Sequence, residues 1–374
     1  MSDVRVLAAP LGRGATIGIL GGGQLGRMLC QAAARLGLKT HVYSPEADAP
    51  AFQVSAAATC AAYDDETALA RFARDCDAIT FEFENVPEAT LALLAALKPV
   101  APGARALGLT QDRLAEKRFI AGLGIATAPF DPVDTAEDAA RAFARLGGPC
   151  VLKTRRLGYD GKGQAKAQTA EEAEAGFAAL RRAPAILERF VDFAFEASVI
   201  AVRGCDGSFG AYDPPANEHE NHILRRSSVP APLSEAQVES AKRIARGIAE
   251  ALDYVGVLAV ELFVARDHTL IVNEIAPRVH NSGHWTIEAC AASQFGNHIR
   301  AVAGWPLGST ERHSDAVMEN ILGDEVTAWL GKLDTPGLHL YGKREARPGR
   351  KMGHITRIYP KDGPARRSQF LHED

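Results

Sequence analysis

Residues 16–29, TIGILGGGQLGRML, combine a short apolar stretch, three consecutive glycines at 21–23 and the start of an amphipathic pattern. The apolar residues after the glycines recur at helical spacing, and Gly37 ends that pattern. Further strands are expected at 40–43 and 78–83, and Pro87 is expected to begin the helix after the second of them. Alternating strands and helices predict a parallel, doubly wound sheet in the first third of the chain.

The glycine turn itself, Gly21-x-Gly23-x-x-Gly26, leaves three interpretations open. Its amides and the helix N-terminus could hold a nicotinamide dinucleotide, they could hold another anion, or the turn could be purely structural. A dinucleotide site also needs an acidic residue at the end of the second strand. Residues 43–45 are Tyr-Ser-Pro, and Glu46 comes only after the proline, which argues against the dinucleotide.

Beyond residue 110 the pattern changes to mixed α+β. Helices are expected at 111–122 and 136–146, before an apolar strand at 150–154. A capping box at Ser234 predicts the start of a long helix. The tail has short strands and turns. The expected domains are a Rossmann-like N-terminal domain (1–110), a central domain (111–304) and a small β-rich C-terminal domain (305–374).

Composition excludes several classes of protein. The chain has 42 Lys and Arg against 46 Asp and Glu, a net charge of −4, which argues against coating nucleic acid. No apolar stretch approaches the ~18 residues that span a bilayer, and the N-terminus lacks the pattern of a signal peptide. The six cysteines are scattered singly, which is typical of free thiols in a reducing compartment. We therefore expect a cytoplasmic protein without nucleic-acid or membrane partners.

A second glycine-rich loop, GYDGKGQ at 158–164, follows the strand that ends near Lys153. Its glycines would let the backbone approach phosphates, and Lys162 adds positive charge. It is not a Walker A motif, because no Ser or Thr follows a lysine after the last glycine. A phosphate-binding flap and a mobile surface turn are both compatible with this sequence.

Two glutamates are expected to face one another in a hairpin. If the turn centres on residues 267–268 so that Arg266 pairs with Thr269, Glu261 lies directly opposite Glu274. Their Cβ atoms would then be about 5 Å apart, where like charges need a cation between them. Magnesium with nucleotide phosphates would supply it. The alternative is that each glutamate pairs with an arginine.

Two further segments carry polar and basic side chains. Residues 277–285, PRVHNSGHW, offer donors suited to a small oxyanion, whereas Gly283 and the lack of a third ligand argue against zinc at its two histidines. Lys343, Arg350 and Lys351 could form a phosphate clamp or a solvated tail.

Five segments occur in one order: GGGQLGRM (21–28), TFEFENVP (80–87), GYDGKGQ (158–164), NEIAPRVHNSGHWT (273–286) and RPGRKMGH (347–354). Together they resemble the ATP-grasp superfamily and, within it, the 5-(carboxyamino)imidazole ribonucleotide synthase family. The resemblance covers nearly the whole chain. It implies an ATP-grasp fold between the Rossmann-like domain and the small β-rich domain, and a homodimer.

The resemblance also implies site residues, position by position. ATP would be bound by Arg113, Lys153, the loop Gly158-Tyr159-Asp160-Gly161-Lys162-Gly163-Gln164, the adenine segment Glu188-Arg189-Phe190-Val191, Glu196 at the ribose, His219, Asn273 and Glu274. Magnesium would lie on Glu261 and Glu274, and bicarbonate on Arg278, His280 and Asn281. The aminoimidazole ribonucleotide would contact Gln24, Glu84, Tyr159, Asp160, Lys343, Arg350 and Lys351. Among these, Asp160, Arg278, His280, Asn281 and Lys343 would be catalytic.

The implied reaction is ATP- and bicarbonate-dependent carboxylation of the amine of 5-aminoimidazole ribonucleotide, through carboxyphosphate, in purine biosynthesis. Asp160 would position the amine or take its proton. The sequence departs from many ATP-grasp enzymes at Ala276, where they have an asparagine ligand, so the number of magnesium ions stays open. The alternatives are another ATP-grasp carboxylate–amine ligase and a nicotinamide-dependent oxidoreductase.

Overall fold

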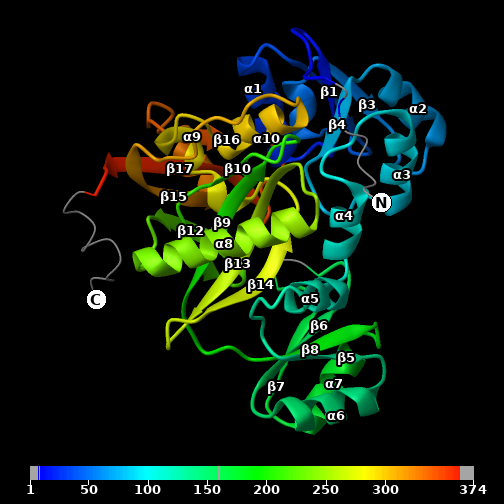
Figure 1. Cartoon of the computed structure of the whole chain (residues 1–374), viewed down its shortest axis with the longest axis vertical. Coiled ribbons are helices and arrows are strands. Elements are labelled where there is room, and N and C mark those ends of the chain that lie inside the picture. The colour runs from blue at the N-terminus through cyan, green and yellow to red at the C-terminus, as the bar shows by residue number, and fades with distance from the viewer. Residues whose placement is uncertain (1–6, 8, 159–160, 363–374) are drawn as a thin grey trace.

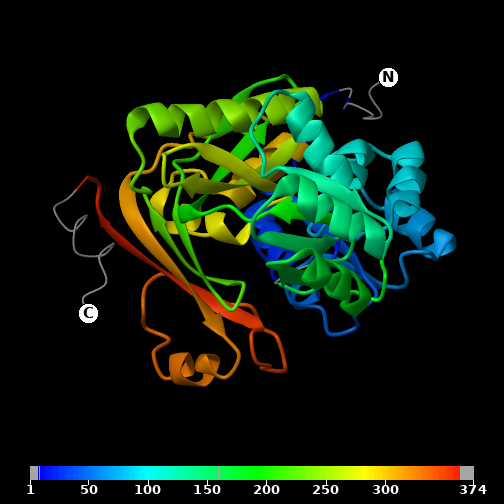
Figure 2. The ribbon, with the colours of Figure 1, turned by 90° about the horizontal axis from the view of Figure 1, so that it is seen from below.

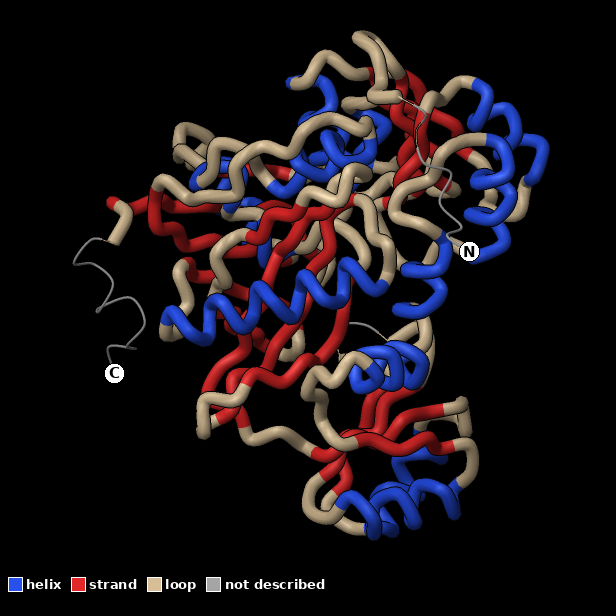
Figure 3. Tube along the Cα trace, in the orientation of Figure 1, coloured by secondary structure: helices blue, strands red, loops and turns tan. Residues whose placement is uncertain are grey.

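Three β-sheets organise the chain in the computed structural model, which describes residues 7, 9–158 and 161–362 (Figure 1). Figure 3, in the same orientation, shows the strands of the sheets and the helices around them. No helix within the described ranges has the length and apolar character needed to cross a membrane. All six cysteines are free thiols, four of them buried, and Cys60 and Cys205 exposed.

The N-terminal sheet is parallel throughout, with the order β3-β2-β1-β4. Its strands are β1 (Thr16–Leu20), β2 (Lys39–Ser44), β3 (Ala57–Cys60) and β4 (Ala78–Phe81). The helices of this region are α1 (Gln24–Arg35), η1 (Pro50–Gln53), α2 (Glu66–Arg74), α3 (Glu88–Leu97) and α4 (Ala104–Thr110). Residues of α1 share a buried cluster with Ile17 and Ile19, whereas residues of α2 and α3 pack with Leu20 and Phe81. Helices therefore cover both faces, which confirms the predicted doubly wound sheet.

A smaller antiparallel sheet forms the lobe at the bottom of Figure 1, with the order β5-β8-β6-β7. Its strands are β5 (Phe130–Val133), β6 (Cys150–Thr154), β7 (Gln164–Ala167) and β8 (Ala185–Arg189). Helices α6 (Ala136–Leu146) and α7 (Ala170–Ala179) pack on it through one apolar cluster. Helix α5 (Arg113–Gly122) lies between this lobe and the rest of the molecule (Figure 1).

The central sheet has nine strands and reaches into the tail of the chain. Its strands are β9 (Phe193–Arg203), β10 (Phe209–Ala211), β11 (Ala216–Glu220), β12 (Ile223–Val229), β13 (Gly256–Ala265), β14 (Leu270–Ala276), β15 (Ser314–Leu322), β16 (Leu338–Leu340) and β17 (Lys351–Pro360). The tail is β-rich, as expected, and β15 pairs with β12, so its strands extend the central sheet (Figure 2). The remaining helices are α8 (Glu235–Ala251), η2 (Asn281–Gly283), α9 (Thr286–Ala289), α10 (Gln294–Val302) and α11 (Glu325–Leu330).

Local signals explain where several elements begin. The Ser234 hydroxyl accepts a hydrogen bond from the Gln237 amide, and the Gln237 side chain accepts one from the Ser234 amide, which confirms the predicted capping box of α8. Asp112 caps α5 by accepting from the amides of Leu114 and Ala115. This cap sets the first turn of α5, which carries Arg113.

Candidate active site

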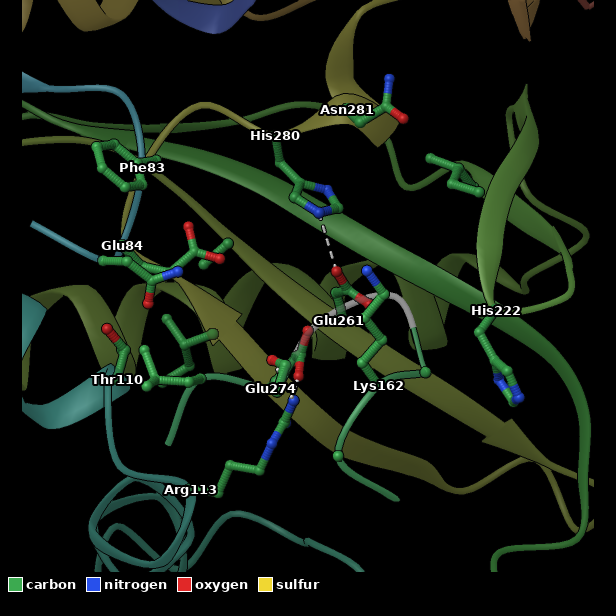
Figure 4. A pocket seen from close by; sticks show the side chains of 18 of the residues that line it. Phe83, Glu84, Thr110, Arg113, Lys162, His222, Glu261, Glu274, His280 and Asn281 are labelled. Carbon is green, nitrogen blue, oxygen red and sulfur yellow. Dashed lines mark hydrogen bonds and ion pairs between the residues drawn. The ribbon is translucent and has the colours of Figure 1, made fainter. Parts of the chain in front are cut away.

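A cleft of about 900 Å³ lies where the three sheets meet. The glycine turn after β1, the small lobe, the β13–β14 hairpin and the basic segment before β17 all contribute to its lining. Figure 4 shows part of the lining, with the side chains of Glu261, Glu274 and His280 close together and Arg113 approaching from α5. Segments that are far apart in the sequence therefore meet in one site.

Every predicted site residue that the structure describes lines this cleft. They are Gln24, Glu84, Arg113, Lys153, Gly158, Gly161, Lys162, Gly163, Gln164, Glu188, Arg189, Phe190, Val191, Glu196, His219, Glu261, Asn273, Glu274, Arg278, His280, Asn281, Lys343, Arg350 and Lys351. Tyr159 and Asp160 lie outside the described residues. Lys343, Arg350 and Lys351, for which the sequence left a phosphate clamp and a solvated tail open, all line the cleft.

The β13–β14 hairpin brings Glu261 and Glu274 directly opposite one another, as predicted. The register that produces this pair differs from the expected one. Ala265 pairs with Thr269 at the turn, and a bulge between Glu261 and Leu262 leaves Asn273 as the extra residue. The predicted pairing of Arg266 with Thr269 is therefore wrong, and the bulge shifts the register back by one residue at the glutamates.

Each of the two glutamates has an ion-pair or hydrogen-bond partner from another element. Nε2 of His280 lies 2.9 Å from the Glu261 carboxylate, and the Arg113 guanidinium lies 2.6 Å from that of Glu274. Burial alone would raise the pKa of Glu261, but the charge of His280 holds it well below its usual range. The two carboxylates lie opposite one another in the hairpin, and the buried Oδ1 of the adjacent Asn273 has no hydrogen-bond partner among the described residues. Carboxylate and amide oxygens are the hard donors that magnesium prefers, so the side chains of this part of the hairpin fit such an ion.

A buried row of charges supports Lys153. Its Nζ donates to the Glu188 carboxylate at 2.9 Å, and Nζ of Lys117 lies 3.6 Å from the same carboxylate. Burial alone would raise the pKa of Glu188, but the two ammonium groups lower it to about 2. The contact with Glu188 holds Lys153 in place. Since an ammonium group has three N–H donors, Lys153 can still donate hydrogen bonds to a ligand in the cleft.

The first glycine turn is filled by a carboxylate of the protein itself. The amides of Gly23 and Gly26 donate to the Glu82 side chain at 2.6 and 2.9 Å. A Cβ on Gly21, whose φ is 101°, would meet the Glu82 side chain at 2.4 Å, so glycine is required there. Burial raises the pKa of Glu82, although the two amides oppose this. Because these two amides are occupied, the turn at this helix N-terminus does not offer them to a dinucleotide phosphate.

Arg278 forms a two-point ion pair with Glu84, which comes from the segment after β4. Burial alone would raise the pKa of Glu84, but the charge of Arg278 lowers it to about 2. A third donor of Arg278 reaches the Val279 carbonyl at 3.1 Å. A guanidinium group has five N–H donors, and three of them are used in these contacts with described residues, which leaves two for a ligand as far as the described part of the chain shows.

Two neighbours of Arg278 are held by hydrogen bonds on the side away from the cleft glutamates. Nδ1 of His280 lies 2.9 Å from the Ser282 hydroxyl, which in turn lies 2.7 Å from the Ser198 hydroxyl. The side-chain amides of Asn281 and Asn320 exchange two hydrogen bonds, at 3.0 and 2.7 Å. These contacts fix the loop after β14 against strands β9 and β15 of the central sheet.

Glycine is also required in the second glycine-rich loop. Gly161 and Gly163 have φ values of 76° and 73°. A Cβ at Gly161 would meet the His222 ring at 2.5 Å, and one at Gly163 would meet Thr154 Oγ1 at 2.6 Å. The loop therefore packs closely on β6 and on the β11–β12 turn, beside the cleft.

Three supporting residues are absent from the sequence-based prediction: Glu82, Glu116 and Lys117. Glu82 follows β4, and β4 is parallel to β1, so the glycine turn and Glu82 share one edge of the sheet. Lys117 lies one helical turn after Arg113, and a side chain at that spacing shares its face. The Glu116 carboxylate accepts from the Ile275 amide at 2.7 Å, and burial together with the charge of Glu274 raises its pKa. The position at the sheet edge could have predicted Glu82, and the helix-face spacing could have predicted Lys117.

Three family models match the chain. They are a ribonucleotide synthetase preATP-grasp domain over residues 14–111, an ATP-grasp domain over 118–295 and a phosphoribosylaminoimidazole carboxylase C-terminal domain over 316–368. The N5-carboxyaminoimidazole ribonucleotide synthase of Brucella melitensis is 53% identical over 352 residues, which cover 93% of this chain and 97% of that protein.

Solved structures agree with these matches. The N5-carboxyaminoimidazole synthetase of Staphylococcus aureus complexed with ADP is 39% identical, with a TM-score of 0.89 over 94% of both chains. The Aspergillus clavatus synthase in complex with ADP and 5-aminoimidazole ribonucleotide is 32% identical, with a TM-score of 0.86 over 93% of this chain and 95% of that one.

Proposed function

Because the chain belongs to the N5-carboxyaminoimidazole ribonucleotide synthase family, we propose that it uses ATP and bicarbonate to carboxylate the amine of 5-aminoimidazole ribonucleotide. The chain is an ATP-grasp ligase that forms a carbon–nitrogen bond. The observation that carries the proposal is the position of Arg278, His280 and Asn281, which follow the two-glutamate hairpin directly and line the same cleft as Lys153.

The nucleotide side of the proposal rests on the charges around Glu188. ATP would place its phosphates between Lys153 and the loop at 158–164, with the adenine near residues 189–191. His219 Nδ1 lies 2.8 Å from the Glu196 carboxylate, which orients that carboxylate for the ribose. Phosphoryl transfer depends mainly on positioning and on neutralising negative charge, and this part of the cleft supplies both.

Glu261 and Glu274 would hold magnesium, with Asn273 beside them. When bound, the ion would neutralise part of the negative charge on the phosphates. Side chains of the protein position the carboxylates and the phosphate. Arg113 and His280 hold the two carboxylates in place, and Lys153 holds the phosphate that bicarbonate attacks.

The acceptor side rests on the two unused donors of Arg278. In the proposed reaction a bicarbonate oxygen attacks the γ-phosphate, ADP leaves, and carboxyphosphate forms. Arg278 would stabilise its negative charge until it breaks down to carbon dioxide and phosphate. The amine of the ribonucleotide then bonds to the carbon dioxide and loses a proton, for which Asp160 is the proposed acceptor. Lys343 and Arg350 would hold the ribonucleotide phosphate.

A steady-state assay of ADP release tests the proposal. We expect release to require both bicarbonate and 5-aminoimidazole ribonucleotide, and to stop when either is omitted. If glycinamide ribonucleotide with formate stimulates release instead, the chain is another ATP-grasp carboxylate–amine ligase. Release that does not depend on any acceptor would contradict both. Since the Glu82 side chain occupies the amides of Gly23 and Gly26, no absorbance change is expected with NADH or NADPH.

Binding of the ribonucleotide should weaken in alkaline solution because of Lys343. Burial and the neighbouring charge of Arg350 lower the pKa of Lys343 to about 8. Its ammonium group therefore loses its proton as the pH rises through 8. We expect KM for the ribonucleotide to rise about tenfold per pH unit above that point, when measured from about pH 7 to about pH 9.5.

Lys343→Arg is the matched control, because arginine stays charged over this range. The variant should show a nearly flat KM profile. A profile as steep as that of the unchanged protein would show that another group is responsible. The phosphate of the ribonucleotide contributes little to the slope above pH 8, because its second pKa is about 6.

We also propose that the chain works in the cytoplasm as a homodimer, as the family resemblance implies. Light scattering of the purified chain tests the second part. A mass of twice 39.9 kDa would support a dimer.

A further inference from the structure

A cluster of metal-ligating side chains lies in the tail, apart from the cleft. Glu288, His339 and His354 each offer one ligand atom, and these atoms lie within 4.8 Å of one another. None of the three side chains lines the cleft. The cluster is therefore distinct from the two glutamates of the β13–β14 hairpin.

The sheet places the two histidines together. His339 on β16 and His354 on β17 are direct partners in the antiparallel pairing. Their rings are stacked, with centroids 4.5 Å apart and planes inclined by 10°. Helix α9 adds Glu288, whose Oε1 lies 2.7 Å from Nε2 of His339. Three separate elements thus converge on one point.

Polar atoms in this cluster lack partners although they are buried. His354 is fully buried, and Tyr341 Oη lies 2.8 Å from its Nδ1. Its Nε2 has no hydrogen-bond partner among the described residues, and neither has Oε2 of Glu288. Nε2 of the adjacent His284 is equally without a partner within that part of the chain. Such groups are rare in folded proteins unless water or an ion satisfies them.

We propose that Glu288, His339 and His354 bind one divalent transition-metal ion of the zinc class. Imidazole nitrogens and a carboxylate are ligands of zinc, whereas magnesium prefers oxygen alone. Metal-bound histidines usually make a hydrogen bond through their second nitrogen, as His354 does with Tyr341. His339 and Glu288 are 28% and 20% exposed at their side chains, which gives the ion a path from solvent.

The ion would connect three elements that carry cleft residues or adjoin them in the chain. Helix α9 follows the loop with His280 and Asn281, β16 precedes Lys343, and β17 begins at Lys351. A metal ion here would therefore stabilise the part of the cleft that is proposed to bind bicarbonate and the ribonucleotide. Its role is structural, and the proposal does not depend on the reaction that the cleft performs.

The test measures metal binding by the full-length chain without an affinity tag. The chain carries Cys60→Ser and Cys205→Ser, because these two exposed thiols could bind zinc themselves. Excess magnesium is present, so that Glu261 and Glu274 do not take up zinc. After chelator treatment, Zn(II) is titrated against a chromophoric chelator, and Co(II) is added separately to record its visible absorption. We expect about one ion per chain and a rise in Tm with Zn(II).

Two variants remove ligand atoms with little change of shape. Glu288→Gln removes the charge, and His354→Asn keeps an atom near the position of Nδ1 while removing Nε2. Each should weaken Zn(II) binding by more than about 100-fold, beyond the range typical of outer-shell changes. Both should also lose the Tm shift. Circular dichroism of each variant without metal checks that it is folded.

His313→Asn is the matched control, because His313 is exposed and lies outside the cluster. It should bind Zn(II) as tightly as the parent chain. The proposal is overturned if the parent binds no tightly held ion, since water then satisfies the unpartnered atoms. It is also overturned if binding survives both ligand variants or is lost in His313→Asn.

Discussion

Replacing Arg278 with methionine should lower the rate of ADP release in the presence of bicarbonate and 5-aminoimidazole ribonucleotide by about 10³-fold. Arg278 is the cation beside the proposed oxyanion position, and two of its N–H donors have no assigned role in the described structure. Methionine keeps the length and most of the apolar stem but provides no charge. ATP affinity should change little, because the nucleotide side of the cleft depends on Lys153 and Arg113.

The measurement is kcat and KM for each substrate, together with ATP affinity by calorimetry. Arg278→Lys separates charge from geometry, since lysine restores one charge without the planar two-point pair to Glu84. It should recover only part of the rate. Arg266→Met is the matched control, because the Arg266 side chain is 70% exposed and pairs with the exposed Asp192.

Loss of Arg278 also leaves the Glu84 carboxylate without its partner, so the fold of the variant must be checked. Glu84→Gln combined with Arg278→Met removes both charges and relieves that penalty. If the double variant regains activity, the defect of the single variant came from the unpaired Glu84. If ATP affinity falls as much as turnover, Arg278 belongs to the nucleotide site.

Replacing Glu274 with glutamine should reduce ADP release by about 10³-fold, equivalent to about 4 kcal/mol. The change keeps the shape of the side chain but removes one of two facing carboxylates in the β13–β14 hairpin. The magnesium concentration for half-maximal rate should rise at the same time. Titration of the rate with magnesium at saturating ATP measures both effects.

Glu261→Gln should act in the same direction, and the double variant should be little worse than either single variant, because the two carboxylates serve one ion. Glu239→Gln on α8 is the control, since its side chain is 62% exposed. An unchanged magnesium requirement in both hairpin variants would contradict the assignment of these glutamates as ligands. The Glu274 variant also frees Arg113, so ATP affinity is measured in parallel.

Several features were predictable because they depend on residues close together in the sequence. The strand at 16–20, the glycine turn, the capping box at Ser234 and the strand at 150–154 are confirmed with their predicted bounds. The pairing of Glu261 with Glu274 is also confirmed, since a hairpin limits which residues can face one another. The bulge at Asn273 was not predictable from alternation alone, because it leaves the apolar pattern of the strand nearly intact.

The sequence by itself determined the alternation of strands and helices, the order of the five motifs and the chemical types of side chain in the cleft. Apart from the Glu261–Glu274 pair within one hairpin, only the tertiary structure decided which charged side chains meet. Glu84 reaches Arg278 across 194 residues, Lys117 joins Lys153 on Glu188, and Glu82 occupies the amides of the first glycine turn. These contacts depend on how separate sheets pack, and local propensity does not encode that packing. For the same reason the glycine turn, where the sequence left an anion site open, proves to be filled by the protein's own carboxylate.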